Sequence, residues 1–333
     1  MKAIGYFRSL PVEHPESLVT LDVPTPTPGP DDLLVDVGAV SVNPVDFKVR
    51  RSRSGTPEKP VILGWDAAGV VVAVGPSVRG FRSGDRVYYA GDLGRDGSNA
   101  ELQVVDARLA ALAPQSLDFA EAAALPLTAL TAYEGLFEKL RVPEDAAADV
   151  LVAGGAGGVG SMAVQLLRAR TDARIWATAG RPESRRWLEQ LGVHGLLGRG
   201  KSLEEEARVA GAPEFDAVFV TTGTAEHLPS LPAITKPFGS IVLIDEPGPF
   251  DFAPFKPKSL SLHWELMFTK SRFRFRMETQ GAILSAVARG VYESRLRSTI
   301  GKRYVGFTPD HFRAAHAELE AGTAVGKIVI ERT

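Results

Sequence analysis

The chain has 333 residues with a formal net charge of −2, a length that exceeds one ordinary hydrophobic core and predicts two domains. The small net charge provides no global field that would attract nucleic acid or an anionic membrane, so we expect neither as a partner. The absence of cysteine excludes disulfides, thiolate zinc sites, iron–sulfur clusters and cysteine nucleophiles. The first ten residues, MKAIGYFRSL, lack the apolar core of a secretory signal, and we expect a cytoplasmic protein.

Residues 1–110 are predicted to be rich in β-strands. Short runs of β-branched residues, such as LLVDVGAVSV, AAGVVVAVG and DRVYYAG, are separated by clusters of glycine and proline. The proline-rich stretch VPTPTPGPDD, residues 23–32, can be read as a P-x-x-P ligand, but a stiff loop between two strands is favoured.

The pattern changes near residue 120. Residues 118–140 have helical spacing, and strands then alternate with helices. The strand segments are continuous apolar runs, which are typical of strands buried on both faces of a parallel sheet: DVLVAG, ARIWATAG, FDAVFVTTG and GSIVLID. The intervening helix PESRRWLEQLG is expected to begin at Pro182 and to be closed by Gly192.

This alternation predicts a doubly wound α/β domain that ends near residue 262. The last stretch, residues 310–331, reads as one helix and one strand that return to the first domain. We therefore expect an α/β protein with a discontinuous β-rich domain, 1–122 and 263–333, and a doubly wound parallel-sheet domain, 123–262.

A glycine motif joins the strand DVLVAG to the helix that follows it. Gly155, Gly157 and Gly160 spell G-x-G-x-x-G, with Gly158 and Val159 inside the motif. In a dinucleotide fingerprint the glycines allow a tight turn, close approach of a pyrophosphate, and close packing of helix on strand. The helix dipole and free N–H groups then favour an anion. The alternative is a structural glycine-rich turn.

The end of the next strand indicates which nucleotide is bound. NAD sites place an acidic residue about 20 residues beyond the glycines, where it binds the ribose 2′-hydroxyl. Here Ala179 and Gly180 occupy that region and Arg181 follows. An arginine can bind a 2′-phosphate, so NADPH is predicted, although Arg181 can also be a solvated charge at a helix start.

Three further patterns are given a structural interpretation. GLLGRGKS, residues 195–202, fits a phosphate-binding loop, but a helix rather than a strong strand precedes it, so we expect a short strand followed by the helix LEEEARVA. KSRFRFRMETQ, residues 270–280, is interpreted as an amphipathic extended segment at a domain junction rather than a nucleic-acid surface. His311 and His316 do not share a helix face, and the six histidines are expected at the surface.

Nine stretches carry a family resemblance: SVNPVDFKVR, VILGWDAAGVVVAVG, GDRVYYAG, NAELQVVD, LPLTALTAYEGL, VAGGAGGVGSMAVQLL, ATAGRPESRRWLEQLG, SLSLHWELMF and AGTAVGKIVIE. They resemble the medium-chain dehydrogenase/reductase superfamily, within it the zinc-free quinone oxidoreductase branch and a subgroup often labelled zinc-type alcohol dehydrogenase-like. The resemblance implies a GroES-like β domain from both ends of the chain and an inserted Rossmann domain. It also implies an active site in the cleft and a homodimer formed by the last Rossmann strands.

The resemblance also predicts the absence of catalytic zinc. The positions that match the zinc ligands carry Asn43, Trp65 and Leu127, with Asp66 at the position of a nearby glutamate. An amide, an indole and an alkyl chain do not replace thiolates and imidazole around zinc. The remaining chemistry is hydride transfer from NADPH to a quinone or an α,β-unsaturated carbonyl compound. The alternatives are an alkenal or double-bond reductase of the same fold, and a non-catalytic NADPH-binding sensor or crystallin-like protein.

Candidate catalytic residues follow from these positions. Asn43 can stabilise an oxyanion or tie down the turn before Pro44, and Asp46 can orient Lys48 or a backbone loop. Tyr88 can donate a hydroxyl, and Trp264 can form an apolar wall, although either can be a core residue. By resemblance, further residues line the cofactor: Thr131, Thr221, Thr222, Leu243, Asp245 and Lys327.

Overall fold

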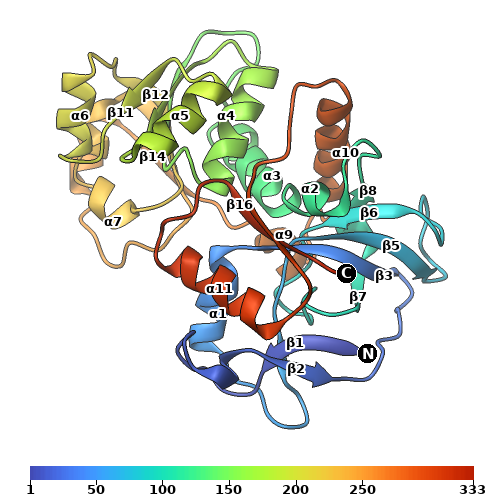
Figure 1. Cartoon of the computed structure of the whole chain (residues 1–333). Coiled ribbons are helices and arrows are strands. Elements are labelled where there is room, and N and C mark those ends of the chain that lie inside the picture. Colours follow the sequence, from blue (N-terminus) through green and yellow to red (C-terminus); the bar gives the residue numbers. More distant parts are fainter. The chain divides into compact units, whose positions relative to one another are not determined.

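The computed structural model describes residues 1–333 and divides into two compact units. Unit 1 comprises Met1–Leu127 and Phe268–Thr333, and unit 2 comprises Thr128–Met267. Figure 1 shows the elements of each unit along the chain. The corresponding breaks predicted from the sequence lie after residues 122 and 262. The strand Ser261–Trp264 pairs within the sheet of unit 2, which carries that unit past residue 262.

Unit 1 is built on a seven-stranded sheet of order β15-β16-β3-β5-β6-β8, with β7 also paired to β3. The strands are β3 Asp32–Val42, β5 Ala67–Val74, β6 Arg86–Tyr89, β7 Leu102–Asp106, β8 Ala110–Leu112, β15 Ile300–Val305 and β16 Lys327–Glu331. Strand β3 alternates buried and half-buried residues, as expected for a strand with one face on a core. Strand β16 pairs antiparallel with β3, so the end of the chain returns to the first domain, as predicted.

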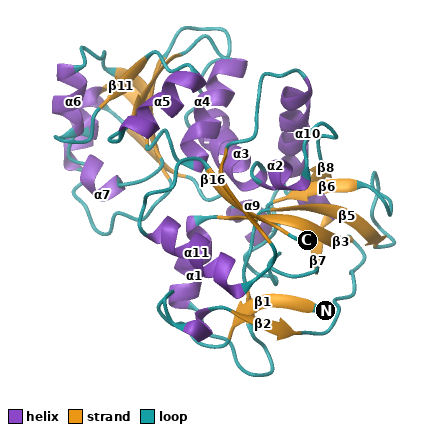
Figure 2. Ribbon diagram, viewed as in Figure 1, coloured by secondary structure: helices purple, strands orange, loops and turns teal.

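A smaller sheet and six helices complete unit 1. The sheet has the order β2-β1-β4, and Figure 2 shows it as short strands near the N-terminus. Its strands are β1 Lys2–Tyr6, β2 Val19–Asp22 and β4 Val61–Ile62. The helices are α1 Pro44–Ser52, α2 Phe119–Ala123, α9 Phe268–Arg272, α10 Glu278–Tyr292, α11 Pro309–Glu320 and the start of α3 Pro126–Tyr133, which continues into unit 2. The proline-rich residues 23–31 form the predicted loop between β2 and β3.

Unit 2 is a doubly wound domain with a six-stranded sheet of order β11-β10-β9-β12-β13-β14. Every neighbouring pair is parallel. The strands are β9 Asp149–Ala153, β10 Arg174–Thr178, β11 Gly195–Leu197, β12 Phe215–Val220, β13 Thr235–Leu243 and β14 Ser261–Trp264. The central strand β9 is buried throughout, which explains its continuous apolar sequence. This Rossmann-like unit and the β-rich unit 1 confirm the predicted fold class.

The helices of unit 2 follow the expected strand–helix alternation. They are α4 Gly158–Arg170, α5 Pro182–Leu191, α6 Leu203–Val209, α7 Thr224–His227 and α8 Leu231–Ile234, after a π-helical segment over Glu134–Lys139. Helix α5 begins at Pro182 and is closed by Gly192, whose φ of 83° favours glycine, as predicted. The short strand β11 and helix α6 confirm the interpretation of residues 195–202. The backbone N–H groups of Gly198 and Gly200 in that loop donate to the Glu206 carboxylate. These donors are therefore occupied by a side chain of the protein itself, where a phosphate-binding loop would offer them to a phosphate.

Two local expectations were wrong. The Arg/Phe segment is not extended: it contains helix α9 and then tight turns, because Arg274 and Arg276 both have φ near 50°. The histidines are not all at the surface, because His227 and His316 are buried. His316 accepts a hydrogen bond from Arg50 in the interior of unit 1, and burial lowers its pKa to about 3. No helix has both the length and the apolar character needed to cross a membrane.

Candidate active site residues

The glycine loop of unit 2 has the backbone geometry of a dinucleotide cradle. The Gly157 N–H donates to the Gly154 carbonyl at 3.2 Å, and helix α4 begins directly afterwards at Gly158. A side chain at Gly160 would collide with the Gly154 carbonyl, and one at Gly155 would lie 2.8 Å from the Ala177 Cβ. These two glycines therefore allow close packing of the helix on the strands. In contrast, a Cβ at Gly157 would meet nothing closer than 3.5 Å, which leaves that side of the loop open to a ligand.

The ends of β10 and β12 flank this loop. Thr178 Oγ1 accepts a hydrogen bond from Gly154 N at 2.8 Å, and Thr221 Oγ1 donates to the Ala153 carbonyl at 2.8 Å, so both neighbouring strands hold the loop in place. Arg181 is the N-cap residue of α5, its side chain is 40% exposed, and it pairs with Glu183 at 3.2 Å. The contact of Arg181 with a 2′-phosphate stays a prediction.

Other predicted cofactor residues have internal roles. Leu243 is fully buried and packs in the core of unit 2. The Asp245 carboxylate accepts hydrogen bonds from Gly223 N at 3.1 Å and from Thr224, and thereby holds the start of α7. Among the remaining predicted residues, Thr131 is buried and Thr222 is exposed.

In unit 1, four polar side chains form a buried polar cluster, defined as Asn43, Asp46, Asp66 and Lys327. The Lys327 ammonium lies 3.1 Å from Asp66 Oδ2 and also donates to Asn43 Oδ1. The Asn43 amide donates to Asp66 Oδ2 at 3.1 Å, and the Asn43 backbone N–H donates to Asp46 Oδ2 at 2.7 Å. All four residues are at most 3% exposed.

Burial governs the protonation of this cluster. The pKa of Asp46 is raised to about 7, chiefly by desolvation and to a smaller extent by the nearby Asp66 carboxylate, against the lowering effects of the Asn43 N–H and the Lys327 charge. Burial also raises the pKa of Asp66 and lowers that of Lys327, while their mutual attraction opposes both shifts. The cluster is stable in the core because one ammonium and several hydrogen bonds compensate two carboxyl groups.

The residues at the expected zinc positions do not fit zinc. The Trp65 indole N–H donates to the Asp92 carbonyl at 3.0 Å, and Leu127 supplies only a backbone N–H, which donates to Asp66 Oδ1 at 3.1 Å. No three His, Cys, Asp or Glu side chains are grouped to hold a metal ion. The cation in contact with Asn43 is the Lys327 ammonium, so no step of the chemistry is assigned to a metal.

The predicted catalytic side chains are largely engaged inside unit 1. Asn43 uses its amide N–H groups on Asp66 and on the Ser41 carbonyl, so it ties down the start of α1 and has no donor left for an oxyanion. Asp46 completes the same capping box. The Tyr88 hydroxyl is buried and donates to the Leu284 carbonyl at 2.5 Å, so it is engaged inside unit 1, and a catalytic role for it stays a prediction.

Of the last two predicted residues, one is held in the interior and one keeps an exposed surface. Lys327 was expected to reach the cofactor or the cleft, but its ammonium is held inside the buried polar cluster. Its partners were missed because Asn43 is 284 residues away in sequence. Trp264, at the end of β14, is 50% exposed and is available to contact a flat ligand.

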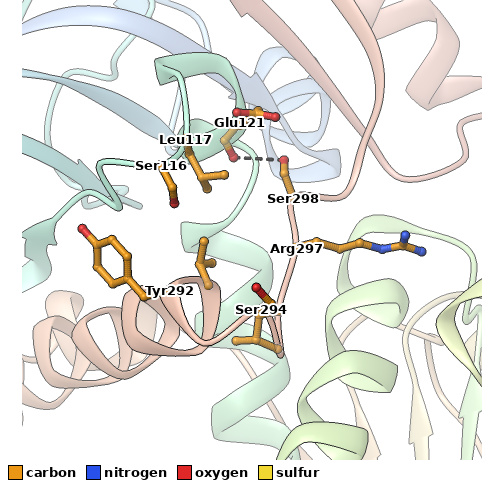
Figure 3. A pocket seen from close by; sticks show the side chains of 9 residues that line it. Ser116, Leu117, Glu121, Tyr292, Ser294, Arg297 and Ser298 are labelled. Carbon is orange, nitrogen blue, oxygen red and sulfur yellow. Dashed lines mark hydrogen bonds between the residues drawn. The ribbon is translucent and has the colours of Figure 1, made fainter.

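Unit 1 also has a surface hollow that is lined by none of the predicted site residues. Figure 3 shows Ser116, Glu121, Tyr292 and Ser298 around it, with the Ser298 hydroxyl donating to the Glu121 carbonyl at 3.0 Å. None of the residues that line this hollow belongs to the buried polar cluster, and the hollow lacks a buried charged group aimed into it. We assign it no role.

Comparisons with known proteins cover nearly all of the chain. Residues 29–115 match the alcohol dehydrogenase GroES-like domain, and residues 158–284 match the zinc-binding dehydrogenase domain. A zinc-type alcohol dehydrogenase-like protein of Staphylococcus aureus is 34% identical and covers 99% of both chains. The 2-methylene-furan-3-one reductase of Solanum lycopersicum is 32% identical over 99% of this chain and 79% of its own.

Two solved structures extend this comparison. A putative zinc-dependent alcohol dehydrogenase protein from Rhizobium etli is 46% identical, covers 99% of this chain and 98% of its own, and superposes with a TM-score of 0.95. A mycobacterial protein solved in complex with NADPH is 25% identical, covers 99% of both chains and has a TM-score of 0.84.

Proposed function

Because the chain belongs to the medium-chain dehydrogenase/reductase superfamily, a family of oxidoreductases, we propose that it is an NADPH-dependent, zinc-independent reductase of quinones or α,β-unsaturated carbonyl compounds. The observation that carries this proposal is the buried polar cluster, in which the Lys327 ammonium contacts Asn43 and Asp66 at the positions that match a zinc site. Alcohol oxidation through a zinc-bound alkoxide needs ligands that this chain lacks.

Residues of unit 2 fit NADPH as the hydride donor. Gly157 leaves one side of the glycine loop open, and the first turn of α4 supplies N–H groups and a positive dipole end for the pyrophosphate. Arg181 supplies a cation for the 2′-phosphate directly after Ala179 and Gly180, which occupy the region where NAD enzymes have an acid. Bound NADPH would supply a hydride. The NADPH complex of the mycobacterial relative supports this choice.

The acceptor class follows from what this chain can contribute. A quinone or enone accepts hydride at a ring or β-carbon, and the negative charge on its carbonyl oxygen needs hydrogen-bond donors rather than a metal. With Asn43 and Tyr88 engaged, the chain's own contribution is to orient the acceptor and exclude water, and the exposed face of Trp264 is one surface available to a flat molecule. The tomato reductase is named for an enone substrate, which supports this class.

The test is turnover of the purified protein with NADPH and a panel of quinones and enals, followed at the reduced-nicotinamide absorbance band. We expect turnover that a chelator leaves unchanged, and no oxidation of primary alcohols with NADP⁺. Chelator-sensitive alcohol oxidation would refute the proposal. Tight NADPH binding without turnover of any acceptor would instead favour the sensor or crystallin-like alternative.

We also infer a homodimer formed along β14. This strand lies at one end of the sheet of unit 2, so its outer edge has backbone groups available to a second copy. Leu266, just beyond it, is 49% exposed and adds apolar surface. Light scattering of the full chain tests this assembly: we expect the mass of two chains, and the mass of one chain would refute the inference.

A further inference from the structure

One arginine outside the glycine motif lies along the carboxyl edge of the sheet of unit 2. Arg199 follows β11, and its aliphatic stem passes beside Gly180 at the end of β10. A Cβ built on Gly180 would lie 3.3 Å from the Arg199 Cβ and 3.6 Å from its Cδ. Glycine at position 180 therefore leaves the space that the stem of Arg199 uses.

The other end of this side chain lies near the end of β12. Nη2 of Arg199 is 3.6 Å from where a Cβ of Gly223 would stand, and 3.5 Å from Glu226 Oε2. In the sheet, β9 lies between β10 and β12, and β9 leads into the glycine loop. A side chain that spans from Gly180 to Gly223 therefore crosses the edge of the sheet at the nucleotide loop. It is 39% exposed, so a ligand can reach it.

A second feature at the same place points to a ligand. His227 is 4% exposed, its Nε2 has no hydrogen-bond partner, and this atom lies 3.5 Å from the same Cβ position on Gly223. Buried polar atoms are nearly always paired in folded proteins, so an unpaired one beside an accessible arginine marks a position where a ligand can complete the pairing.

We propose that Arg199 is a second determinant of selectivity for NADPH, and that its guanidinium binds the 2′-phosphate together with Arg181. This inference rests on the proposed function, because it needs the nucleotide in the glycine loop. The 3.5 Å pair between Arg199 and Glu226 is longer than the 2.7–2.9 Å typical of charge-assisted hydrogen bonds. A dianionic phosphate with three acceptor oxygens can therefore replace the Glu226 carboxylate as the partner of Arg199.

The experiment measures dissociation constants by calorimetry for NADPH, NADH, adenosine 2′,5′-bisphosphate and AMP. For Arg199→Ala we expect binding of the two 2′-phosphorylated ligands to weaken by about tenfold or more, since hydrogen bonds between charged groups are the strong ones. Binding of NADH and AMP should change by less than about twofold. The matched control is Arg208→Ala, which removes an exposed arginine from the last turn of α6.

Two further variants test the competition with Glu226 and guard against misfolding of Arg199→Ala. Glu226→Gln should strengthen NADPH binding, because the carboxylate no longer competes for Arg199, and Arg199→Lys should retain part of the affinity if Arg199→Ala fails to fold. Equal weakening of NADPH and NADH by Arg199→Ala would overturn the inference and indicate a contact with the adenosine. Unchanged dissociation constants of Arg199→Ala for both NADPH and NADH would also overturn the inference, while leaving the proposed function intact. If the unaltered protein binds neither NADPH nor the bisphosphate, the proposed function fails as well.

Discussion

Replacing Lys327 with Met tests the physical account of the buried polar cluster. Methionine keeps an unbranched side chain of similar reach but removes the ammonium, which is 3% exposed and lies 3.1 Å from Asp66 Oδ2. Asp66, fully buried, then keeps its hydrogen bonds from Asn43 and Leu127 but has no cation. Removing one partner of a buried ion pair costs about 3–5 kcal/mol, because a charge is left uncompensated in the core.

This loss corresponds to a decrease of about 6–20 °C in the melting temperature of a unit of this size. Scanning calorimetry is the appropriate assay, because two units can unfold in separate transitions and only that of unit 1 should move. The double variant Lys327→Met/Asp66→Asn should recover most of the loss, since the remaining carboxamide is neutral. Lys302→Met, which breaks an exposed pair with Glu318, is the control and should cost less than about 1 kcal/mol.

The pH dependence gives an independent check. Burial raises the pKa of Asp66, and loss of the lysine charge removes an interaction that lowers it. The folded variant therefore holds a proton that the unfolded chain releases, and its stability should increase as the pH falls. A loss below about 1 kcal/mol for Lys327→Met, or a double variant no more stable than the single one, would refute the account of the cluster.

Three further predictions concern residues already placed. Gly157→Ala should weaken NADPH binding in a titration and leave the melting temperature nearly unchanged, because its methyl group enters the side of the loop open to the ligand, whereas Gly160→Ala should also lower the melting temperature, because its methyl group meets the Gly154 carbonyl; an unchanged affinity of Gly157→Ala would contradict the cradle geometry. Burial raises the pKa of Asp46 to about 7, so the free energy of unfolding should fall as the pH rises from about 4 to about 7, and Asp46→Asn should flatten that slope in denaturant melts. Tyr88→Phe should cost about 1 kcal/mol of stability and leave kcat unchanged, and a large loss of kcat would restore a catalytic role.

The doubly wound unit could be predicted from the sequence because its signals are local. The apolar run 150–153 forms β9, and Pro182 and Gly192 bound α5 because their backbone preferences act within one turn of helix. The glycine spacing likewise placed the loop before α4. Each of these features depends on residues that are neighbours along the chain, so single-sequence reasoning reaches them.

The buried polar cluster could not be predicted in the same way. Lys327 meets Asn43 across 284 residues of sequence, and neither residue carries a local sign of its partner. His316 was expected at the surface, but Arg50 is folded into the core beside it. In the Arg/Phe segment the alternating pattern suggested an extended backbone, whereas positive φ angles at Arg274 and Arg276 turn the chain sharply. Tertiary packing decided these three cases.

The internal ammonium also constrains the reaction that this fold can catalyse. Zinc polarises a substrate oxygen by accepting its lone pair, whereas a lysine ammonium can only donate hydrogen bonds. The hydrogen bonds of Lys327 go to Asp66, Asn43 and the Val42 carbonyl, and burial leaves the group no route to a substrate oxygen. Its charge therefore neutralises carboxylates and does not activate an acceptor. The proposed reaction therefore takes its reactivity from the acceptor itself, which favours a conjugated carbonyl compound over a saturated alcohol or ketone.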